Sequence, residues 1–147
     1  MRFIQVLKTR AGKQINFVSV IPKIETICQK YKIDLFYMFG SYANGSAGKL
    51  SDLDLAYYSK HTVNDSKILP LLQDLFEEEA IDLVNLKNAP LPLIHRVLKG
   101  KCLYARNIKI KIEFETRAEA RYFDTVPLRE EYFEQMMERI EHGTYGT

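Results

Sequence analysis

Cysteine is scarce in this sequence, and the two cysteines that occur are not spaced to bind a metal. Cys28 and Cys102 stand far apart in a chain of 147 residues, each among apolar neighbours. Zinc sites and disulfide frameworks use cysteines at short, repeated spacings, which are missing here. We therefore expect two buried, reduced thiols and a cytoplasmic location.

The chain also lacks an excess of either charge and any long apolar run. Its 21 basic and 19 acidic residues leave a net charge of +2, which argues neither for nor against a nucleic-acid or membrane partner. No segment approaches the roughly 20 apolar residues that span a membrane, and residues 1–14 hold no apolar stretch long enough for a signal peptide. We expect a soluble protein with no membrane partner, and direct nucleic-acid binding is not expected.

The sequence does contain enough hydrophobic residues, 46% of the total, for one core in a single domain over residues 1–147. Helical and strand periods alternate along it. They predict helices at 21–32, 65–79 and 93–99, strands at 33–39, 52–58, 81–86 and 102–105, and two helices within 108–141 separated near Pro127. This order predicts an α/β (α+β) fold, in which helices pack on one short mixed sheet and residues 106–147 form a helical tail.

Four local features are assigned to the ends of helices. Pro22 is expected early in the first helix, where proline is tolerated, and Asp65 is expected to cap the second helix. Gly100 is expected at the C-cap of helix 93–99, and Asn44-Gly45 fits a left-handed helix end.

The most informative stretch is GSYANGSAGKLSDLDL, residues 40–55. Gly40-Ser41 follows one predicted strand, and Asp52 and Asp54 open the next. Since strand side chains alternate between faces, the two aspartates point the same way, while the leucines after each point into the core. Two carboxylates on one face repel each other unless they are solvated or a cation lies between them, and oxygen ligands favour Mg²⁺ or Mn²⁺.

A third carboxylate, Asp82, heads a strand that can lie beside residues 52–55. Neighbouring strands are about 4.8 Å apart, so three carboxylates there could hold two metal ions. Metals of this kind bring phosphates, and Gly40-Ser41 offers backbone N–H groups and a hydroxyl to hold them. The alternative for the aspartates is a solvated strand end after a turn. Ser41 can be a helix N-cap and a phosphate ligand at once, because both roles use the same geometry.

The pattern of Gly-Ser, ten residues and Asp-x-Asp, with a third aspartate in a later strand, resembles the polymerase-β type nucleotidyltransferases. The runs IDLVNLKNAPLPLIHRVLKGKCLYAR and FETRAEARYFDTVPLREEYFEQMMERI resemble more narrowly the minimal nucleotidyltransferases (MNT) that are paired with HEPN toxins. This resemblance covers nearly the whole chain and implies the nucleotidyltransferase fold.

The resemblance implies an antitoxin that transfers AMP from Mg-ATP to a tyrosine hydroxyl of a cognate HEPN ribonuclease, with which it forms a hetero-oligomer. Asp52 and Asp54 would hold two Mg²⁺ ions, with Mn²⁺ as a substitute, and Asp82 would share one of them and orient the acceptor hydroxyl. Gly40 and Ser41 would bind the nucleotide. One departure is Asn44, where many relatives carry Arg, so that any phosphate contact of this Arg is lost or supplied by Lys49.

Other residues and functions stay open. A cluster of basic residues runs from helix 93–99 onward and forms either a solvated face or a contact for a nucleotide tail or RNA. Its members are Arg96, Lys99, Lys101, Arg106, Lys109 and Lys111. The stripe of Leu128, Tyr132, Met136 and Ile140 is either core packing or, with Phe133 and Met137, a partner surface. His61, His95 and His142 are assigned no role. The alternative functions are a small-molecule nucleotidyltransferase of the antibiotic-modifying kind, and a non-enzymatic antitoxin that acts by binding.

Overall fold

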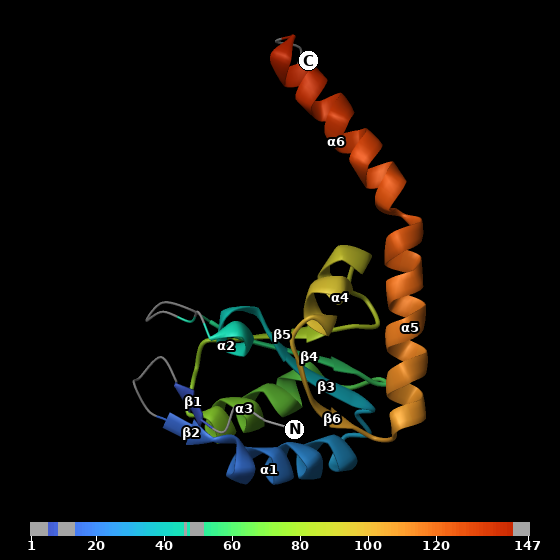
Figure 1. Cartoon of the computed structure of the whole chain (residues 1–147). Helices are drawn as coiled ribbons and strands as arrows, with labels where there is room; N and C mark the ends of the chain where they lie inside the picture. The colour runs from blue at the N-terminus through green and yellow to red at the C-terminus, as the bar shows by residue number, and fades with distance from the viewer. Residues whose placement is uncertain (1–5, 9–13, 46, 48–51, 143–147) are drawn as a thin grey trace.

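The computed structural model describes residues 6–8, 14–45, 47 and 52–142. Its centre is a four-stranded sheet in the order β5-β4-β3-β6 (Figure 1). The strands are β3 (Leu35–Phe39), β4 (Leu53–Tyr58), β5 (Ile81–Asn85) and β6 (Lys101–Ala105). Only β4 and β5 run parallel, and the other neighbours are antiparallel. The predicted short mixed sheet is confirmed.

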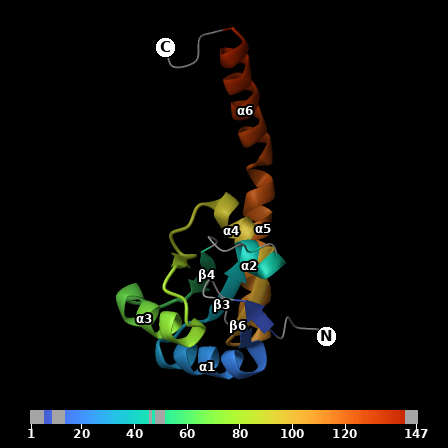
Figure 2. The same ribbon diagram turned by 90° about the vertical axis from the view of Figure 1, so that its left-hand side faces the viewer.

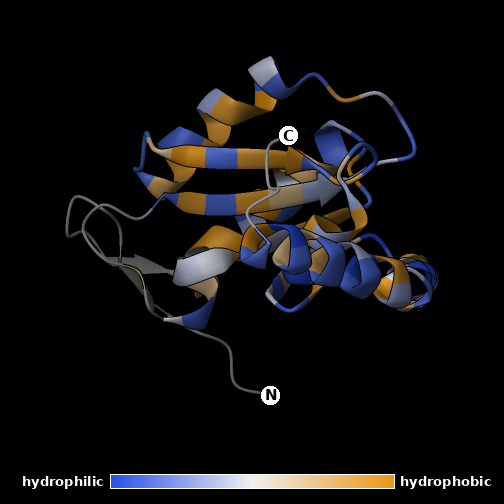
Figure 3. Cartoon of the chain, turned by 90° about the horizontal axis from the view of Figure 1, so that it is seen from above, coloured by the Kyte–Doolittle hydropathy of each residue, from blue (hydrophilic) through white to orange (hydrophobic). Residues whose placement is uncertain are grey.

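Helices cover both faces of this sheet. On one face lie α1 (Phe17–Lys30) and α3 (Asp65–Phe76), and on the other lie α4 (Leu91–Leu98) and α5 (Ile108–Asp124) (Figures 1 and 2). Every residue of β3 is buried, as expected for a central strand with a core on each side. Figure 3 shows hydrophobic colouring along the strands of this sheet.

The N-terminal part differs from the prediction. A two-stranded antiparallel sheet of β1 (Val6–Lys8) and β2 (Gln14–Asn16) precedes α1 and was not predicted from the sequence. Helix α1 begins at Phe17 rather than at residue 21, because Phe17 and Val20 are buried and extend its apolar face. Pro22 therefore lies inside the helix, not in its first turn.

The start of α3 also differs from the prediction. Asn64 is the N-cap, and its Oδ1 accepts a hydrogen bond from Ser66 N at 3.0 Å. The carboxylate of Asp65 instead accepts a hydrogen bond from the hydroxyl of Tyr57. The helix ends at Phe76, earlier than predicted, because Glu77 adopts a left-handed conformation with φ of 51°.

Gly100 is not the C-cap of α4, which is Lys99. A Cβ at position 100 would lie 2.3 Å from Met38 O, so glycine is required by close packing against β3. By contrast, the prediction for Asn44-Gly45 is confirmed, since α2 (Gly40–Asn44) ends at Gly45 with a left-handed φ of 79°.

Two helices follow β6, as predicted. α5 is separated from α6 (Val126–Glu141) at Thr125, and Pro127 lies in the first turn of α6. α6 projects away from the rest of the molecule (Figures 1 and 2), and none of its residues is buried. No helix among the described residues is long and apolar enough to cross a membrane.

Candidate active site

The backbone at Gly40 lies directly against the carboxylate of Asp54. β3 ends at Phe39, which pairs with Asp54 of the antiparallel β4. Gly40 follows with φ of 74°, and a Cβ added there would stand 2.1 Å from Asp54 Oδ2. A side chain at position 40 would therefore collide with this carboxylate, and its backbone conformation also favours glycine. The Gly-Ser pair and the second aspartate of the motif thus meet in space, although residues 46 and 48–51 between them are not described.

Asp82 joins them from the neighbouring strand. β4 and β5 are parallel, and Asp54 is in register with Asp82. Side chains in register on adjacent strands share one face of a sheet, so the two carboxylates are neighbours. This confirms that the strand of Asp82 lies beside that of Asp54.

β4 begins at Leu53, so Asp52 stands immediately before the strand and does not open it as predicted, and its side chain is exposed. The leucines that follow the two aspartates, Leu53 and Leu55, are buried, as predicted. The three carboxylates are held at the end of β4 and β5 next to the turn that leaves β3.

The electrostatics of Asp54 reflect this arrangement. Burial, followed by the charges of Asp82 and then Asp52, raises the pKa of the Asp54 carboxyl above its ordinary value of 3.8, and the nearby charge of Arg96 partly offsets the rise. Burial and the neighbouring negative charges disfavour the ionised form of Asp54, so a cation that binds between these carboxylates stabilises it.

The donor set suits a hard divalent cation, because the carboxylates offer only oxygen ligands. As the side chains stand, no group of three or more His, Cys, Asp or Glu residues within the described ranges is arranged to hold a metal ion. Asp52 and Asp82 are exposed, so their side chains have room to rotate towards Asp54.

Ser41 is the second residue of α2 and is half-buried. The N-cap position belongs to Phe39, and Ser41 is not the helix cap that the sequence allowed. Ser41 contributes its carbonyl oxygen to the other end of the helix, where it accepts the N–H of Gly45.

The six basic residues between Arg96 and Lys111 do not form one face. Arg106 pairs with Asp34 at 3.2 Å, and Lys111 pairs with Glu115 at 2.7 Å. Arg96, Lys99 and Lys101 instead line a cavity of about 350 Å³ at the active-site end. The other residues that line this cavity are Gly40, Ala43, Asn44 and Gly100. In the sequence, Arg96 is one member of a run of basic residues. The packing of α4 against β3 brings Arg96 to the cavity beside Gly40, whereas Arg106 and Lys111 form ion pairs elsewhere.

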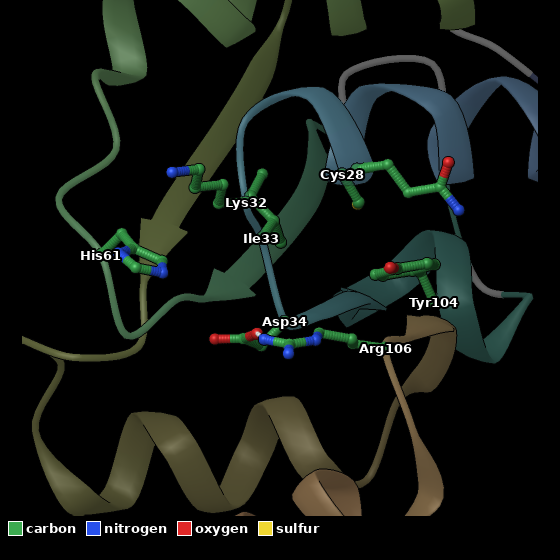
Figure 4. Close-up of a pocket in the computed structure, with 8 residues that line it drawn as sticks. Cys28, Lys32, Ile33, Asp34, His61, Tyr104 and Arg106 are labelled. Atoms are coloured by element: carbon green, nitrogen blue, oxygen red, sulfur yellow. Dashed lines mark hydrogen bonds and ion pairs between the residues drawn. The ribbon is translucent and has the colours of Figure 1, made fainter.

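A second cavity, of about 470 Å³, lies at the opposite end of β3 (Figure 4). One of its lining residues is the buried Asp34, whose Oδ2 accepts the N–H of Lys60 at 2.9 Å and whose Oδ1 accepts from Arg106. Because these bonds satisfy the Asp34 carboxylate, the cluster ties β6 to the start of β3. His61 also lines this cavity, while His95 contacts Glu119 at 2.9 Å and packs α4 on α5.

The cysteines are free thiols, as predicted. Cys28 is buried as expected, whereas Cys102 is only half-buried, contrary to the prediction. Burial raises the pKa of both thiols. They lie on α1 and β6 and take no part in the site.

Comparison with known proteins agrees with this geometry. The family model described as "Polymerase beta, Nucleotidyltransferase" matches residues 22–109. The protein adenylyltransferase MntA of Shewanella oneidensis is 34% identical over 76 residues, which cover 50% of this chain and 55% of that protein. The match therefore spans about half the length of this curated relative.

Two solved structures have the same fold. A toxin-antitoxin crystal structure with AMP-PNP gives a TM-score of 0.68 at 24% identity, covering 80% of this chain and 98% of that chain. The MNT antitoxin in complex with a tri-AMPylated Shewanella oneidensis HEPN toxin gives 0.65 at 21% identity, with 82% and 98% covered. The family match includes Gly40, Ser41 and all three aspartates and covers more than half of the sequence. The chain therefore belongs to the polymerase beta nucleotidyltransferase family.

Proposed function

We propose that the protein is an adenylyltransferase antitoxin that transfers AMP from ATP to a tyrosine hydroxyl of a cognate HEPN ribonuclease toxin. The observation that carries this proposal is the contact of Gly40 with Asp54 beside Asp82, within the part of the chain that the family model matches. The name of the relative MntA, a protein adenylyltransferase, and the neighbouring complex with a tri-AMPylated HEPN toxin support AMP transfer and the kind of partner, while the tyrosine acceptor rests on the family resemblance.

Each residue of the site has a role in this reaction. Asp52, Asp54 and Asp82 would hold Mg²⁺ or Mn²⁺. When bound, two such ions would neutralise the phosphates and lower the pKa of the acceptor hydroxyl. Gly40 and Ser41 bring the backbone close to the aspartates, so that their N–H groups can bind phosphate oxygens.

The transfer breaks the bond between the α-phosphorus and the bridging oxygen of ATP, and pyrophosphate leaves with the electron pair. A bond forms between the tyrosine oxygen and the α-phosphorus. We assign to Asp82, on the edge strand β5, the roles of orienting the hydroxyl and taking its proton. Asp54 is less suited to this task, because it is the carboxylate packed against Gly40.

The acceptor is brought by a partner that docks on the C-terminal helices. The α6 stripe consists of Leu128, Tyr132, Phe133, Met137 and Ile140, whose exposed fractions lie between 42% and 66%. Exposed apolar groups along one helix are typical of a protein interaction surface. The sequence-based alternative of core packing for this stripe is wrong.

The test is intact-mass spectrometry of the HEPN partner after incubation with this protein, ATP and Mg²⁺. We expect the partner to gain about 329 Da for each AMP, the mass of ATP less pyrophosphate, in the two-metal reaction. The double variant Asp52→Asn, Asp54→Asn should bind the partner but add no mass to it. If the partner gains no mass with the wild-type protein, and the double variant silences the ribonuclease as well as the wild type does, the protein acts by binding and the proposal is wrong.

A further inference from the structure

The cavity beside the active site has a strongly basic lining. We call it the basic cavity, and it is formed by Gly40, Ala43, Asn44, Arg96, Lys99, Gly100 and Lys101. It contains three cationic side chains, and none of its described lining residues is acidic. α2 and α4 provide its two sides, and Gly40, which touches Asp54, belongs to both the basic cavity and the carboxylate cluster. Whatever occupies this space next to the aspartates is therefore expected to be an anion.

The cationic side is fixed in place by the packing of the turn after α4. A Cβ at Gly100 would lie 2.3 Å from Met38 O and 2.9 Å from Phe39 Cα, so this turn lies directly on the end of β3. The guanidinium carbon of Arg96 stands 5.7 Å from the centre of the Phe39 ring. Phe39 immediately precedes Gly40, so the position of Arg96 is set relative to the Gly-Ser turn.

The three cationic side chains, Arg96, Lys99 and Lys101, line the basic cavity from α4 and the segment that follows it. Asn44, on the opposite side of the basic cavity, contributes an uncharged amide and is exposed. Among the described lining residues, the cations are Arg96 on α4, Lys99 directly after α4 and Lys101 at the start of β6. None comes from α2.

We propose that Arg96, assisted by Lys99 and Lys101, binds the phosphate chain of the nucleotide and supplies from α4 the cation that α2 lacks at Asn44. A planar guanidinium suits this task because it can donate two parallel hydrogen bonds to phosphate oxygens. The inference rests on the proposed function, since it names the residues that hold the triphosphate of the donor.

The first test measures binding of ATP and of inorganic tripolyphosphate, each with Mg²⁺, by calorimetry. Arg96→Gln should raise the Kd of both ligands about 10- to 100-fold, the usual range for losing a hydrogen bond from a charged group. The matched control is Lys67→Gln, which removes one positive charge from an exposed position on α3, away from the basic cavity. Its Kd values should equal those of the wild type.

The second test asks whether the Arg96→Gln variant loses affinity because it lacks a positive charge in the basic cavity. Asn44→Arg, introduced into the Arg96→Gln variant, places a guanidinium on the other side of the same cavity and should recover most of the lost affinity. If Arg96 served only to pack α4 on Phe39, this substitution would recover nothing. Thermal unfolding of each variant accompanies the measurement, so that a loss of folding is seen separately.

The outcomes separate this inference from the proposed function. Equal Kd values for wild type and Arg96→Gln, with AMP transfer intact, would overturn the role of Arg96 and leave the function standing. Binding of tripolyphosphate that depends on Arg96, without any AMP transfer to the partner, would support the role and contradict the function. A wild-type protein that binds neither ligand would contradict both.

Discussion

The two glycines at the ends of α2 share a left-handed backbone conformation but differ in the atoms that surround them. Gly40 and Gly45 have φ of 74° and 79°, yet a Cβ at Gly45 would meet nothing within 4 Å, whereas a Cβ at Gly40 would collide with Asp54. Gly45 is needed for conformation only, while Gly40 is also needed for the close approach that builds the site.

This pair gives a matched prediction. Gly45→Ala should lower the free energy of unfolding by about 1 kcal/mol, the cost of an alanine at positive φ. Gly40→Ala should lower it further and should also abolish AMP transfer, because the carboxylate of Asp54 must move. Denaturant unfolding and the mass assay measure the two effects. Equal losses of stability in the two variants would show that the contact with Asp54 is unimportant.

The raised pKa of Asp54 predicts a dependence of stability on pH. A carboxyl whose pKa is higher in the folded state binds its proton more tightly there, so its contribution is complete below the ordinary pKa of 3.8 and is lost as the pH rises through the folded value. At pH 7 without divalent cations, Asp54→Asn should therefore have a higher Tm than the wild type.

The difference in Tm between Asp54→Asn and the wild type should disappear below about pH 4, where both side chains are neutral. Added Mg²⁺ should raise the Tm of the wild type and not that of the variant. A lower Tm for Asp54→Asn at pH 7 would mean that this carboxylate stabilises the fold.

Among the helices, α6 differs from those that cover the sheet. It has no buried residue, and it is joined to α5 near Thr125, where Arg129 donates a hydrogen bond to Tyr122 O at 3.2 Å and lies 4.0 Å from the Tyr122 ring centre. The fold of the sheet therefore does not depend on burial of α6, and its apolar stripe is available to a partner.

Removal of the segment after Thr125 should consequently leave the Tm nearly unchanged while partner binding is lost. The comparison is Ile24→Ala in the core, which should cost about 2 to 5 kcal/mol because Ile24 is fully buried on α1. Thermal unfolding and co-purification with the HEPN partner measure the two effects. If the truncated protein is destabilised as much as Ile24→Ala, α6 packs on the core; if it still binds the partner, the α6 stripe is not the docking surface.

At the scale of the whole molecule, the two ends of the sheet have different tasks. At one end, the Gly40 turn, Asp54, Asp82 and Arg96 come from four separate elements and meet beside the basic cavity. At the other end, charged groups are paired with each other, as in the ion pair of Asp34 with Arg106. The carboxylates at the first end thus lie beside a cavity lined by cationic side chains, while the other end is held by satisfied bonds.

The sequence by itself determined the order of the elements that build the central sheet, the mixed sheet and the spacing of Gly40-Ser41 from the aspartates, but not the two-stranded sheet of β1 and β2. These follow from local causes, because hydrophobic periods and turn residues act over a few positions. The family resemblance read from those residues is confirmed by the match over residues 22–109. Helix ends were less well predicted, since Asn64 and Asp65 are equally good caps in isolation and the bond from Tyr57 to Asp65 decides between them.

Only the tertiary structure decided which distant residues meet. The register of β4 and β5 places Asp82 beside Asp54, and the packing of Gly100 on β3 carries Arg96 to the Gly-Ser turn, while Arg106, ten positions later, goes to the opposite end. The exposure of the α6 stripe was likewise undecided, because an apolar helix face looks the same in sequence whether it covers a core or awaits a partner. Such contacts depend on strand pairing and helix packing between segments far apart in the chain, which local sequence patterns do not encode.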